Sequence, residues 1–471
     1  MLRRFLAIAC FHLLSFVPAH AQRDLHVNPT TGADTNDGVA KPVKTIARAV
    51  RLAGPGDTIH LAPVLYHESA DLTKKHGEPD KPITLDGHGA VLDGSEPVLA
   101  KDWESLGNGL YRKLHLVKKM DDAILVRWFM LWNGKMNHMG RTSKGIKAPF
   151  KKPADLQTDE WTYQADEDAF YIRIDPKQDL DAANIRYPAR SSGVIESVTG
   201  SNLIVRNITS THVYNDGFNI HGAIRNCRFE NIAAIECGDD GFSAHEDAEC
   251  FIDGFTSIGN STGLTDTVLS MTRYKNVFIK DCLAYDVFFI GEAAHSIENA
   301  VIESSAEHPL SIGSTTPDGS GKCPVTLTNV LFRRTGKPKE ARVSRGGVMT
   351  AEHCAFIGLT LQAANGSDVT LKHSFVTGDP KPDVLIWKEA KWSGEGNLYD
   401  LGSLRVDKTS FTAKTFADFQ KLTGSEVGSK WESAPTTGAA NFGADESALK
   451  KIQQRAEETV KQFRTISSGR P

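Results

Sequence analysis

The sequence has no excess of basic residues and, after residue 21, no apolar run long enough to span a membrane. Its formal net charge is −4, so electrostatics favour neither nucleic acid nor an anionic membrane surface as a partner. Hydrophobic residues make up 40% of the chain and charged residues 24%, a balance that excludes wholesale disorder. We therefore expect a folded protein with no nucleic-acid partner and no membrane span; the oligomeric state stays open.

The first 21 residues have the pattern of a secretory signal peptide. Arg3 and Arg4 give a positive start, residues 5–17 form an apolar run, and Ala19-His20-Ala21 is a small-residue cleavage site. The apolar run is too short for a membrane-spanning helix. The sequence therefore predicts export, to the periplasm or to the outside of the cell.

One eight-residue phrase occurs twice near the middle of the chain. Residues 215–222 (NDGFNIHG) return as residues 239–246 (DDGFSAHE), an offset of 24 residues. Such a period in β-type sequence is typical of a solenoid, whose coils stack to bury their inner faces. Neighbouring strands in a stack lie about 4.8 Å apart, so equivalent residues form columns on the surface. In this chain the columns contain Asp and His.

Further coils follow from residue 201, where paired positions recur at steps of 19 to 28 residues: 207–208, 226–227, 254–255, 281–282, 304–305, 329–330, 353–354 and 373–374. The second residue of each pair is mostly apolar or small, as an inward-facing position requires. This register places Cys227, Cys282 and Cys354 in one interior column, as reduced packing residues. Cys237 and Cys250 flank the second copy of the phrase, and a disulfide between them is an alternative to free thiols.

The repeat is absent from three parts of the chain. Helical spacing over residues 43–52 predicts a helix that caps the first coil. Residues 97–190 break the period and hold four of the seven tryptophans, which would form the core of an inserted β-rich subdomain or stack on sugar rings. Helical spacing over 411–422 and 446–463 predicts C-terminal helices that lie along the solenoid, cap it or contact a second copy. We expect five parts: a signal peptide (1–21), an N-terminal cap with the first coils (22–96), an inserted subdomain (97–190), the main β-helix (191–400) and a C-terminal helical extension (401–471).

The N-terminal region resembles a known family. Residues 42–46 (PVKTI), 55–59 (PGDTI) and 66–68 (YHE) look like the opening of right-handed parallel β-helix proteins of the pectate-lyase-like superfamily. Residues 156–163 (LQTDEWTY) with 169–176 (AFYIRIDP) are similar to an insert found in several β-helix glycoside hydrolases. The resemblance implies an all-β, right-handed parallel β-helix and a secreted, carbohydrate-active protein with a polysaccharide as its partner.

The columns of Asp and His are the candidate site. Asp216, Asp240, Asp266 and Asp286 each precede a strand of alternating character, in which Phe218, Phe242, Val268 and Phe288 would point inward. Carboxyl groups stacked one coil apart cannot all ionise, so one keeps a proton or a cation neutralises the group. Asp239-Asp240 resembles the adjacent Asp pair of β-helix polygalacturonases, although the other motifs of that family are missing. The candidate residues are Asp216, Asp239, Asp240, His221 and His245 for catalysis, Asn219, Ser243, Glu246 and Arg273 for substrate binding, and Asp247 and Asp266 for a metal ion.

Three functions remain open at this level. In a glycoside hydrolase, which needs no cofactor, one carboxyl group protonates the leaving oxygen while another activates water or attacks carbon. In a polysaccharide lyase, the acids would hold Ca²⁺, and His245, Arg273 or Lys275 would remove a proton from a uronic acid. In a carbohydrate-binding protein without catalysis, the Asp-Gly pairs would serve as turns and the other Asp side chains would cap backbone N–H groups.

Overall fold

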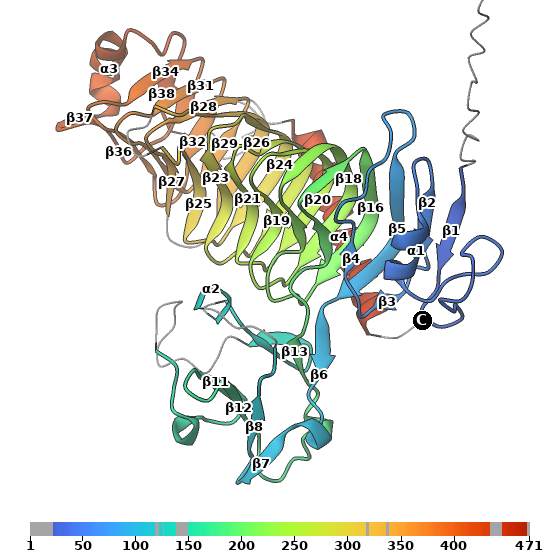
Figure 1. The fold of residues 1–471 in the computed structure, drawn as a ribbon. Helices are drawn as coiled ribbons and strands as arrows, with labels where there is room; N and C mark the ends of the chain where they lie inside the picture. The colour runs from blue at the N-terminus through green and yellow to red at the C-terminus, as the bar shows by residue number, and fades with distance from the viewer. Residues whose placement is uncertain are drawn as a thin grey trace, which may run out of the picture.

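The computed structural model describes residues 22–117, 122–125, 127–137, 149–316, 320–335, 339–433 and 445–468, so the expected signal peptide lies outside the described residues. Within these ranges the chain winds into stacked coils that form a long parallel β-helix (Figure 1). The stack runs from β1 near the N-terminus to α3 at its other end, and an inserted unit projects from one side. The predicted fold class, an all-β parallel β-helix, is confirmed.

The larger wall of the solenoid, here named sheet A, has 18 strands in the described part of the chain. Because neighbouring coils pair in parallel, the backbone groups of each strand are satisfied by the coils on either side. The strands of sheet A are β1 (Asp24–Val27), β2 (Thr58–Leu61), β3 (Leu65–Tyr66), β5 (Ile83–Asp93), β15 (Thr199–Ser201), β16 (Leu203–Thr211), β18 (Ala223–Ile235), β20 (Ala248–Ile258), β22 (Met271–Lys280), β24 (His295–Ser304), β26 (Cys323–Arg334), β28 (Gly347–Glu352), β29 (Ala355–Ile357), β31 (Asp368–Lys372), β32 (Phe375–Thr377), β34 (Lys391–Glu395), β35 (Leu398–Tyr399) and β38 (Lys430–Trp431).

A second wall, here named sheet B, has 12 strands among the described residues. Its inward column includes Phe218, Phe242, Leu264 and Val287, which lie in register on successive coils and are fully buried. The strands of sheet B are β4 (Ala70–Asp71), β14 (Val194–Glu196), β17 (Phe218–Ile220), β19 (Asp240–Ala244), β21 (Thr262–Val268), β23 (Tyr285–Gly291), β25 (His308–Gly313), β27 (Lys339–Val343), β30 (Leu359–Ala363), β33 (Asp383–Ile386), β36 (Ser403–Val406) and β37 (Thr409–Phe411).

Sheet A bends at one residue in each coil, and that residue has a left-handed backbone. Asparagine, which tolerates this conformation because its short side chain can hydrogen-bond locally, takes the position in several coils. Its φ angle there lies between 50° and 57° at Asn207, Asn231, Asn276, Asn299 and Asn329. The side chains also bond along the column, as from Asn329 Nδ2 to Asn299 Oδ1 at 2.6 Å.

This column corrects the register expected from the sequence. Positions 207, 254, 329, 353 and 373 do lie at the bend, but 226, 281 and 304 do not: the bend residues of those coils are 231, 276 and 299. Asn226 and Asp281 also have left-handed backbones, with φ of 52° and 55°, at other corners of their coils. A polar residue before an apolar one therefore marks a corner without showing which corner it is.

The cysteines follow the corrected register. Cys227 lies opposite Cys250 on the next coil, so the expected single column of Cys227, Cys282 and Cys354 is wrong. All six cysteines between Cys227 and Cys354 are buried free thiols, including Cys237 and Cys250. They serve as small packing residues of the core.

Residues 95–188 contain the inserted unit, which has two four-stranded antiparallel sheets in its described part. Trp103, Trp128, Trp132 and Trp161 are buried in its core and do not form an exposed sugar-stacking surface. One sheet contains β6 (Ser95–Pro97), β9 (Met130–Trp132), β10 (Lys135–Asn137) and β13 (Ile185–Pro188), and the other contains β7 (Glu104–Gly107), β8 (Leu110–Leu114), β11 (Glu160–Gln164) and β12 (Ala169–Arg173). The short helix α2 (Asp122–Leu125) precedes β9.

Helices lie at both ends of the solenoid and along it. α1 (Ile46–Leu52) begins after Thr45, whose side chain accepts from Arg48 N, and buries Ile46, Ala49 and Val50 in the solenoid core. α3 (Phe416–Thr423) packs its aromatic residues near the last coils. α4 (Glu446–Ser467) lies along sheet A, with an apolar stripe against that sheet. Among the described helices, none combines the length and apolar composition that a membrane crossing requires.

Candidate active site

The two copies of the repeated phrase stack directly on each other. Phe218 lies opposite Phe242, Asn219 opposite Ser243, and Ile220 opposite Ala244, where β17 pairs with β19. Asp240 N also donates to Asp216 Oδ1 at 3.2 Å, which joins the two acids across the coils. The expectation that this phrase forms a column at a 24-residue offset is confirmed.

Three carboxyl groups meet at the start of these strands. Each of Asp216, Asp239 and Asp240 has a carboxylate oxygen, and these three oxygens lie within 4.8 Å of one another. Asp216 and Asp240 are almost fully buried, while the Asp239 side chain is 16% exposed. Ser243 Oγ donates to Asp240 Oδ2 at 3.1 Å, which holds that carboxyl group against the outer face of sheet B. The stacking therefore assembles the three acids that the sequence predicted for catalysis.

The inserted unit supplies a cation to this group. Arg127 Nη1 lies 2.7 Å from Asp239 Oδ2, and Arg127 Nη2 donates to Asn215 Oδ1 at 3.2 Å. Asn215 Nδ2 in turn donates to Asp216 Oδ2 at 3.0 Å. Arg127 could not be predicted from the sequence, because a residue in a non-repeating insert belongs to no column that would place it.

Burial raises the pKa values of all three acids, but not equally. For Asp216 and Asp240 burial is the largest cause and the charge of Asp239 adds to it, so both pKa values lie well above the usual range. Burial also raises the pKa of Asp239, while Arg127 lowers it. Of the three, Asp239 is therefore the acid whose surroundings most favour the negative charge, while burial favours the protonated forms of Asp216 and Asp240.

The two histidines of the phrase also stack, with ring centroids 4.4 Å apart and an interplanar angle of 17°. Burial is the main cause that lowers both pKa values, to about 4 for His245, where His221 lowers it further. Both imidazoles are therefore neutral at neutral pH. Among the described atoms, His245 Nε2 and Asn219 Oδ1 are buried without a hydrogen-bond partner, which leaves unused polar capacity beside the acids.

Other candidate residues lie apart from the acids. Arg273 and Lys275 are on β22 of sheet A, where Arg273 covers the Phe251 ring and Lys275 pairs with Glu298 at 3.0 Å. Asp247 is exposed and pairs with Arg225. Glu246 is exposed beyond the end of β19, where its charge acts on His221. The structure brings Asn219, Ser243, His221 and His245 to the outer face of sheet B, but not Arg273 or Asp247.

Asp266 and Asp286 correct the expected column. Asp240 pairs with Thr262, whereas Asp266 pairs with Ala244, so the expected alignment of Asp266 with Asp216 and Asp240 is wrong. The Asp266 side chain faces the interior, where it accepts from Thr272 Oγ1 at 2.6 Å and Tyr274 OH at 3.0 Å. Asp286 is fully buried as well. The coil after β19 is shorter than 24 residues, so a fixed offset loses the register there.

A group of aromatic side chains continues the outer face of sheet B. Phe288, which we expected to point inward, lies in the outward row of Ser243 and Thr265, while its neighbours Val287 and Phe289 are buried. Tyr285 lies two strands from Asp240, about 10 Å along the stack. Its ring contacts Phe288, with centroids 4.7 Å apart, and stacks on His308 at 5.0 Å. This half-exposed cluster was not foreseen, since the shifted register assigned Phe288 to the core.

A Ca²⁺ ion finds few free ligands in the acidic group. Ca²⁺ takes six to eight oxygen ligands. Both oxygens of Asp216, Oδ2 of Asp239 and Oδ2 of Asp240 are already bound by protein donors, and Arg127 already supplies a positive charge. The expected metal ligands Asp247 and Asp266 lie on the surface and in the core, respectively. The acidic group is therefore a poor fit for Ca²⁺.

Two pockets flank α4 on sheet A, with volumes of about 880 and 470 Å³. Their linings include none of the residues predicted for the site. The acids instead lie on the wall of sheet B, where the insert reaches the solenoid: the rings of Trp128 and Tyr214 have centroids 5.7 Å apart. The insert thus borders the acidic group on one side.

No family model matches the chain, and no curated protein sequence matches it. A solved structure described as XylC in complex with xylose resembles it with a TM-score of 0.51 and 12% identity, over 83% of this chain and 87% of that chain. A structure described as a glycoside hydrolase has a TM-score of 0.40 and 12% identity, over 91% and 100%. A rhamnogalacturonan lyase has a TM-score of 0.27 and 11% identity, over 79% and 74%. At 12% identity and a TM-score of 0.51, the first structure shows a shared fold. The TM-scores of the other two are below 0.5, so we base no conclusion on them.

Proposed function

We propose that this chain is a secreted glycoside hydrolase whose catalytic carboxyl groups are Asp239 and Asp240. The observation that carries the proposal is the group of three acids with oxygens within 4.8 Å of one another, in which Arg127 favours the charged form of Asp239 while burial favours the protonated forms of the other two. Glycoside hydrolysis needs that division, with one carboxyl group as proton donor and one as a charged base or nucleophile.

The roles follow from the surroundings of each acid. Asp239, the most exposed and the one paired with Arg127, is the charged carboxylate. Asp240, protonated and held by Ser243, is the general acid. Asp216 accepts from the backbone of Asp240 and so positions it.

Substrate contacts would extend from the acids across sheet B. Asn219 and His245 hold polar atoms that the described protein leaves unused, and sugar hydroxyl groups both donate and accept hydrogen bonds. Tyr285 and Phe288 offer aromatic faces about two strands away, which suit the apolar face of a sugar ring. We propose that one sugar unit binds at the acids and a neighbouring unit stacks on these rings.

Two observations disfavour a lyase. A lyase needs a strong base next to the bound uronic acid, and Arg273 and Lys275 lie on sheet A instead. The remaining candidate base, His245, does lie on sheet B, but burial, together with His221, lowers its pKa to about 4, which makes it a weak base. The hydrolase therefore accounts for more of the site.

The test is a panel of polysaccharides and aryl glycosides, with xylose-containing substrates included because xylose is named for the XylC structure. We expect the wild type to release reducing sugar without an unsaturated product, and EDTA to leave the rate unchanged. Asp239→Asn and Asp240→Asn should each lower kcat by at least about 10²-fold. Asn resembles a protonated Asp240, so the fold should survive. An unsaturated product with loss of activity in EDTA would indicate a lyase, and binding without cleavage a carbohydrate-binding protein.

The matched control is Asp253→Asn, which removes an exposed acid from sheet A, where it accepts from Asn276 Nδ2. It should retain full activity. Export is a separate part of the proposal: it predicts that the protein made in its own cells begins near Gln22, which N-terminal sequencing would check. A chain that starts at Met1 and stays inside the cell would contradict secretion, not hydrolysis.

A further inference from the structure

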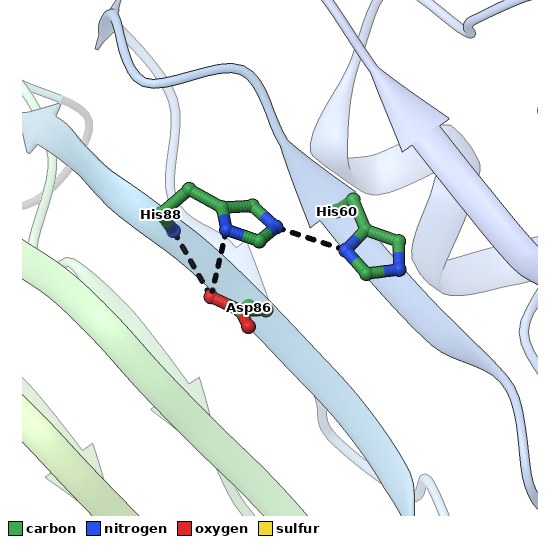
Figure 2. A group of neighbouring side chains, drawn as sticks. All are labelled: His60, Asp86 and His88. Carbon is green, nitrogen blue, oxygen red and sulfur yellow. Dashed lines mark hydrogen bonds and ion pairs between the residues drawn. The ribbon is translucent and has the colours of Figure 1, made fainter.

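A second group of titratable side chains lies on sheet A, near the N-terminal end of the solenoid. His60 comes from β2, and Asp86 and His88 come from the neighbouring strand β5 (Figure 2). The two imidazole rings stack, with centroids 5.2 Å apart, and each of the three residues has a potential metal-ligating atom within 4.8 Å of the others. None of these residues belongs to the acidic group on sheet B.

A bulge in β5 places His88 over His60. The register between β5 and β16 shifts at this point, and His88 has a left-handed backbone with φ of 50°. Gly87 allows the close approach, since a Cβ there would meet Ile208 Cγ1 at 2.3 Å and Asn207 O at 2.5 Å. Asp86 Oδ1 accepts from His88 N at 3.0 Å and so fixes the turn. The local sequence Gly87-His88-Gly89 is thus built to carry a side chain outward at this position.

Each imidazole has a carboxylate at its far nitrogen. His60 Nε2 lies 3.0 Å from Asp24 Oδ1, and His88 Nδ1 lies 3.6 Å from Asp86 Oδ1. The contact of His60 is a hydrogen bond, in which the ring N–H donates and the carboxylate accepts. His60 Nδ1 is therefore the nitrogen of that ring that carries a lone pair.

The near nitrogens of the two rings face each other. His60 Nδ1 and His88 Nε2 are 2.9 Å apart (Figure 2). In one tautomer of His88, Nε2–H donates a hydrogen bond to His60 Nδ1. In the other, the proton lies on Nδ1 toward Asp86, and the two facing lone pairs can bind one metal ion.

We infer that His60 Nδ1 and His88 Nε2 are ligands of a divalent transition-metal ion, of the class that Zn²⁺ represents. Zn–N bonds are about 2.0–2.1 Å long, so nitrogens 2.9 Å apart subtend about 90° at the metal, and a separation of about 3.4 Å gives the tetrahedral angle. A small rotation of His88, whose side chain is 46% exposed, supplies that change. Water would complete the coordination on the open side.

The surroundings select the kind of metal. Imidazole ligands suit Zn²⁺, Ni²⁺ and Cu²⁺, whereas Ca²⁺ and Mg²⁺ require oxygen ligands. Carboxylates that hold the outer N–H of a ligating histidine fix its tautomer and strengthen the ligand, and Asp24 and Asp86 lie where such partners are needed. The ion would join β2 to β5 and so connect the N-terminal cap with the first coils.

The site is tested by adding metal salts to purified protein from which EDTA has removed any bound metal. We expect Zn²⁺ to bind with a stoichiometry of one at this site by calorimetry and to raise Tm by at least about 2 °C at saturation, because ligands of the folded state stabilise it. Ca²⁺ should have no such effect. His88→Asn, which suits the left-handed backbone, and His60→Gln should each weaken Zn²⁺ binding by at least about 10-fold.

Two controls separate this site from others. His353 and His373 form a similar exposed stack, with ring centroids 5.5 Å apart, and His373→Asn should leave the Zn²⁺ effect intact. Asp239→Asn should also leave it intact, which excludes the acidic group on sheet B as the binding site. No Tm shift and no heat of binding with Zn²⁺, or equal binding by wild type and His88→Asn, would overturn the inference and leave a hydrogen bond between the two rings.

Discussion

Arg127 Nη1 lies 2.7 Å from Asp239 Oδ2, and this ion pair joins the inserted unit to the stacked coils. The two residues are 112 positions apart in the sequence. Because Arg127 also binds Asn215, which donates to Asp216, one guanidinium orders the whole acidic group. The insert is therefore a part of the proposed active site and not only an addition to the solenoid.

The first prediction concerns this guanidinium. Arg127 lowers the pKa of Asp239, so Arg127→Met should raise that pKa and move the acidic limb of the pH profile of kcat/KM to higher pH, by about one unit. The sign follows because Asp239 must be charged, and a higher pKa means that it stays protonated to a higher pH. The measurement is kcat/KM against pH on the best substrate of the panel.

Arg112→Met is the matched control for that experiment. Arg112 also forms ion pairs within the insert, with Glu104 and Glu167, but it lies on β8 and not in the turn before β9 that holds Arg127. Its removal should leave the pH profile unchanged. If Arg127→Met kept the wild-type profile, Asp239 would not be the charged catalytic group.

A second prediction concerns the aromatic cluster. Tyr285→Ala and Phe288→Ala should each raise KM by about 2–10-fold with little change in kcat, because stacking worth about 0.5–1.5 kcal/mol binds substrate and transition state equally. Trp387→Ala, at a 42% exposed tryptophan after β33, should leave KM unchanged. Equal KM values for all three variants would remove these rings from the substrate site.

A third prediction concerns the charge of His245. Its pKa is lowered to about 4, mainly by burial and further by His221, so its ring should titrate near pH 4 and not near 6.5. Imidazole signals followed by NMR from pH 3 to 8, assigned with His245→Asn, would measure this. A transition near pH 6.5 for His245 would show that the stacked pair is open to water.

The sequence showed how the coils stack but not all of their lengths. The phrase at 215–222 and 239–246 defined its own register, because two matching segments of eight residues leave only one alignment. Asp266 and Phe288 lie on later coils that are shorter, and the fixed offset failed there. One residue more or less in a coil reverses which of the following side chains face inward. An average period near 24 does not show such single-residue differences in coil length.

The partners of the acids show the same limit. Asp216 and Asp240 could be found because repetition reveals a column. Arg127 and Asn215 act through contacts between parts of the chain that share no repeat. Likewise, the contact between the two histidines on sheet A depends on a bulge at His88. The tripeptide Gly87-His88-Gly89 indicates a turn, but it does not show which residue the His88 side chain will contact. Tertiary neighbours of this kind required the structure.

The last prediction concerns His212, a buried histidine that lies between two acids of neighbouring coils. His212 Nδ1 is 3.2 Å from Asp93 Oδ1, and Nε2 is 3.3 Å from Glu236 Oε2. Arg186 Nη2 lies 3.9 Å from Asp93 Oδ2. Burial alone would lower the pKa of His212, but hydrogen bonds to Asp93 and Glu236 raise it to about 9. Burial would likewise raise the pKa of Asp93, but His212 lowers it to about 2.

These shifts set a pH window for stability. A folded pKa of about 9 against an ordinary value of 6.5 gives His212 a contribution of about 3 kcal/mol, which is complete below about pH 6.5 and lost as the pH rises through 9. The lowered pKa of Asp93 sets the lower limit of the window. Its contribution to stability is present above about pH 4 and is lost as the pH falls toward 2. His212→Asn suits the left-handed backbone, where φ is 53°. It should destabilise the protein by about 3 kcal/mol more at pH 6 than at pH 9.5.

Urea unfolding of both proteins at the two pH values measures that difference. The loss of packing against Phe463, whose ring lies 6.3 Å from that of His212, affects both pH values alike and so cancels. His373→Asn, at an exposed residue with φ of 46°, should show no such dependence on pH. If the cost of His212→Asn were the same at pH 6 and pH 9.5, the buried ring would be neutral, and the Asp93–His212–Glu236 contacts would join the coils by hydrogen bonds alone.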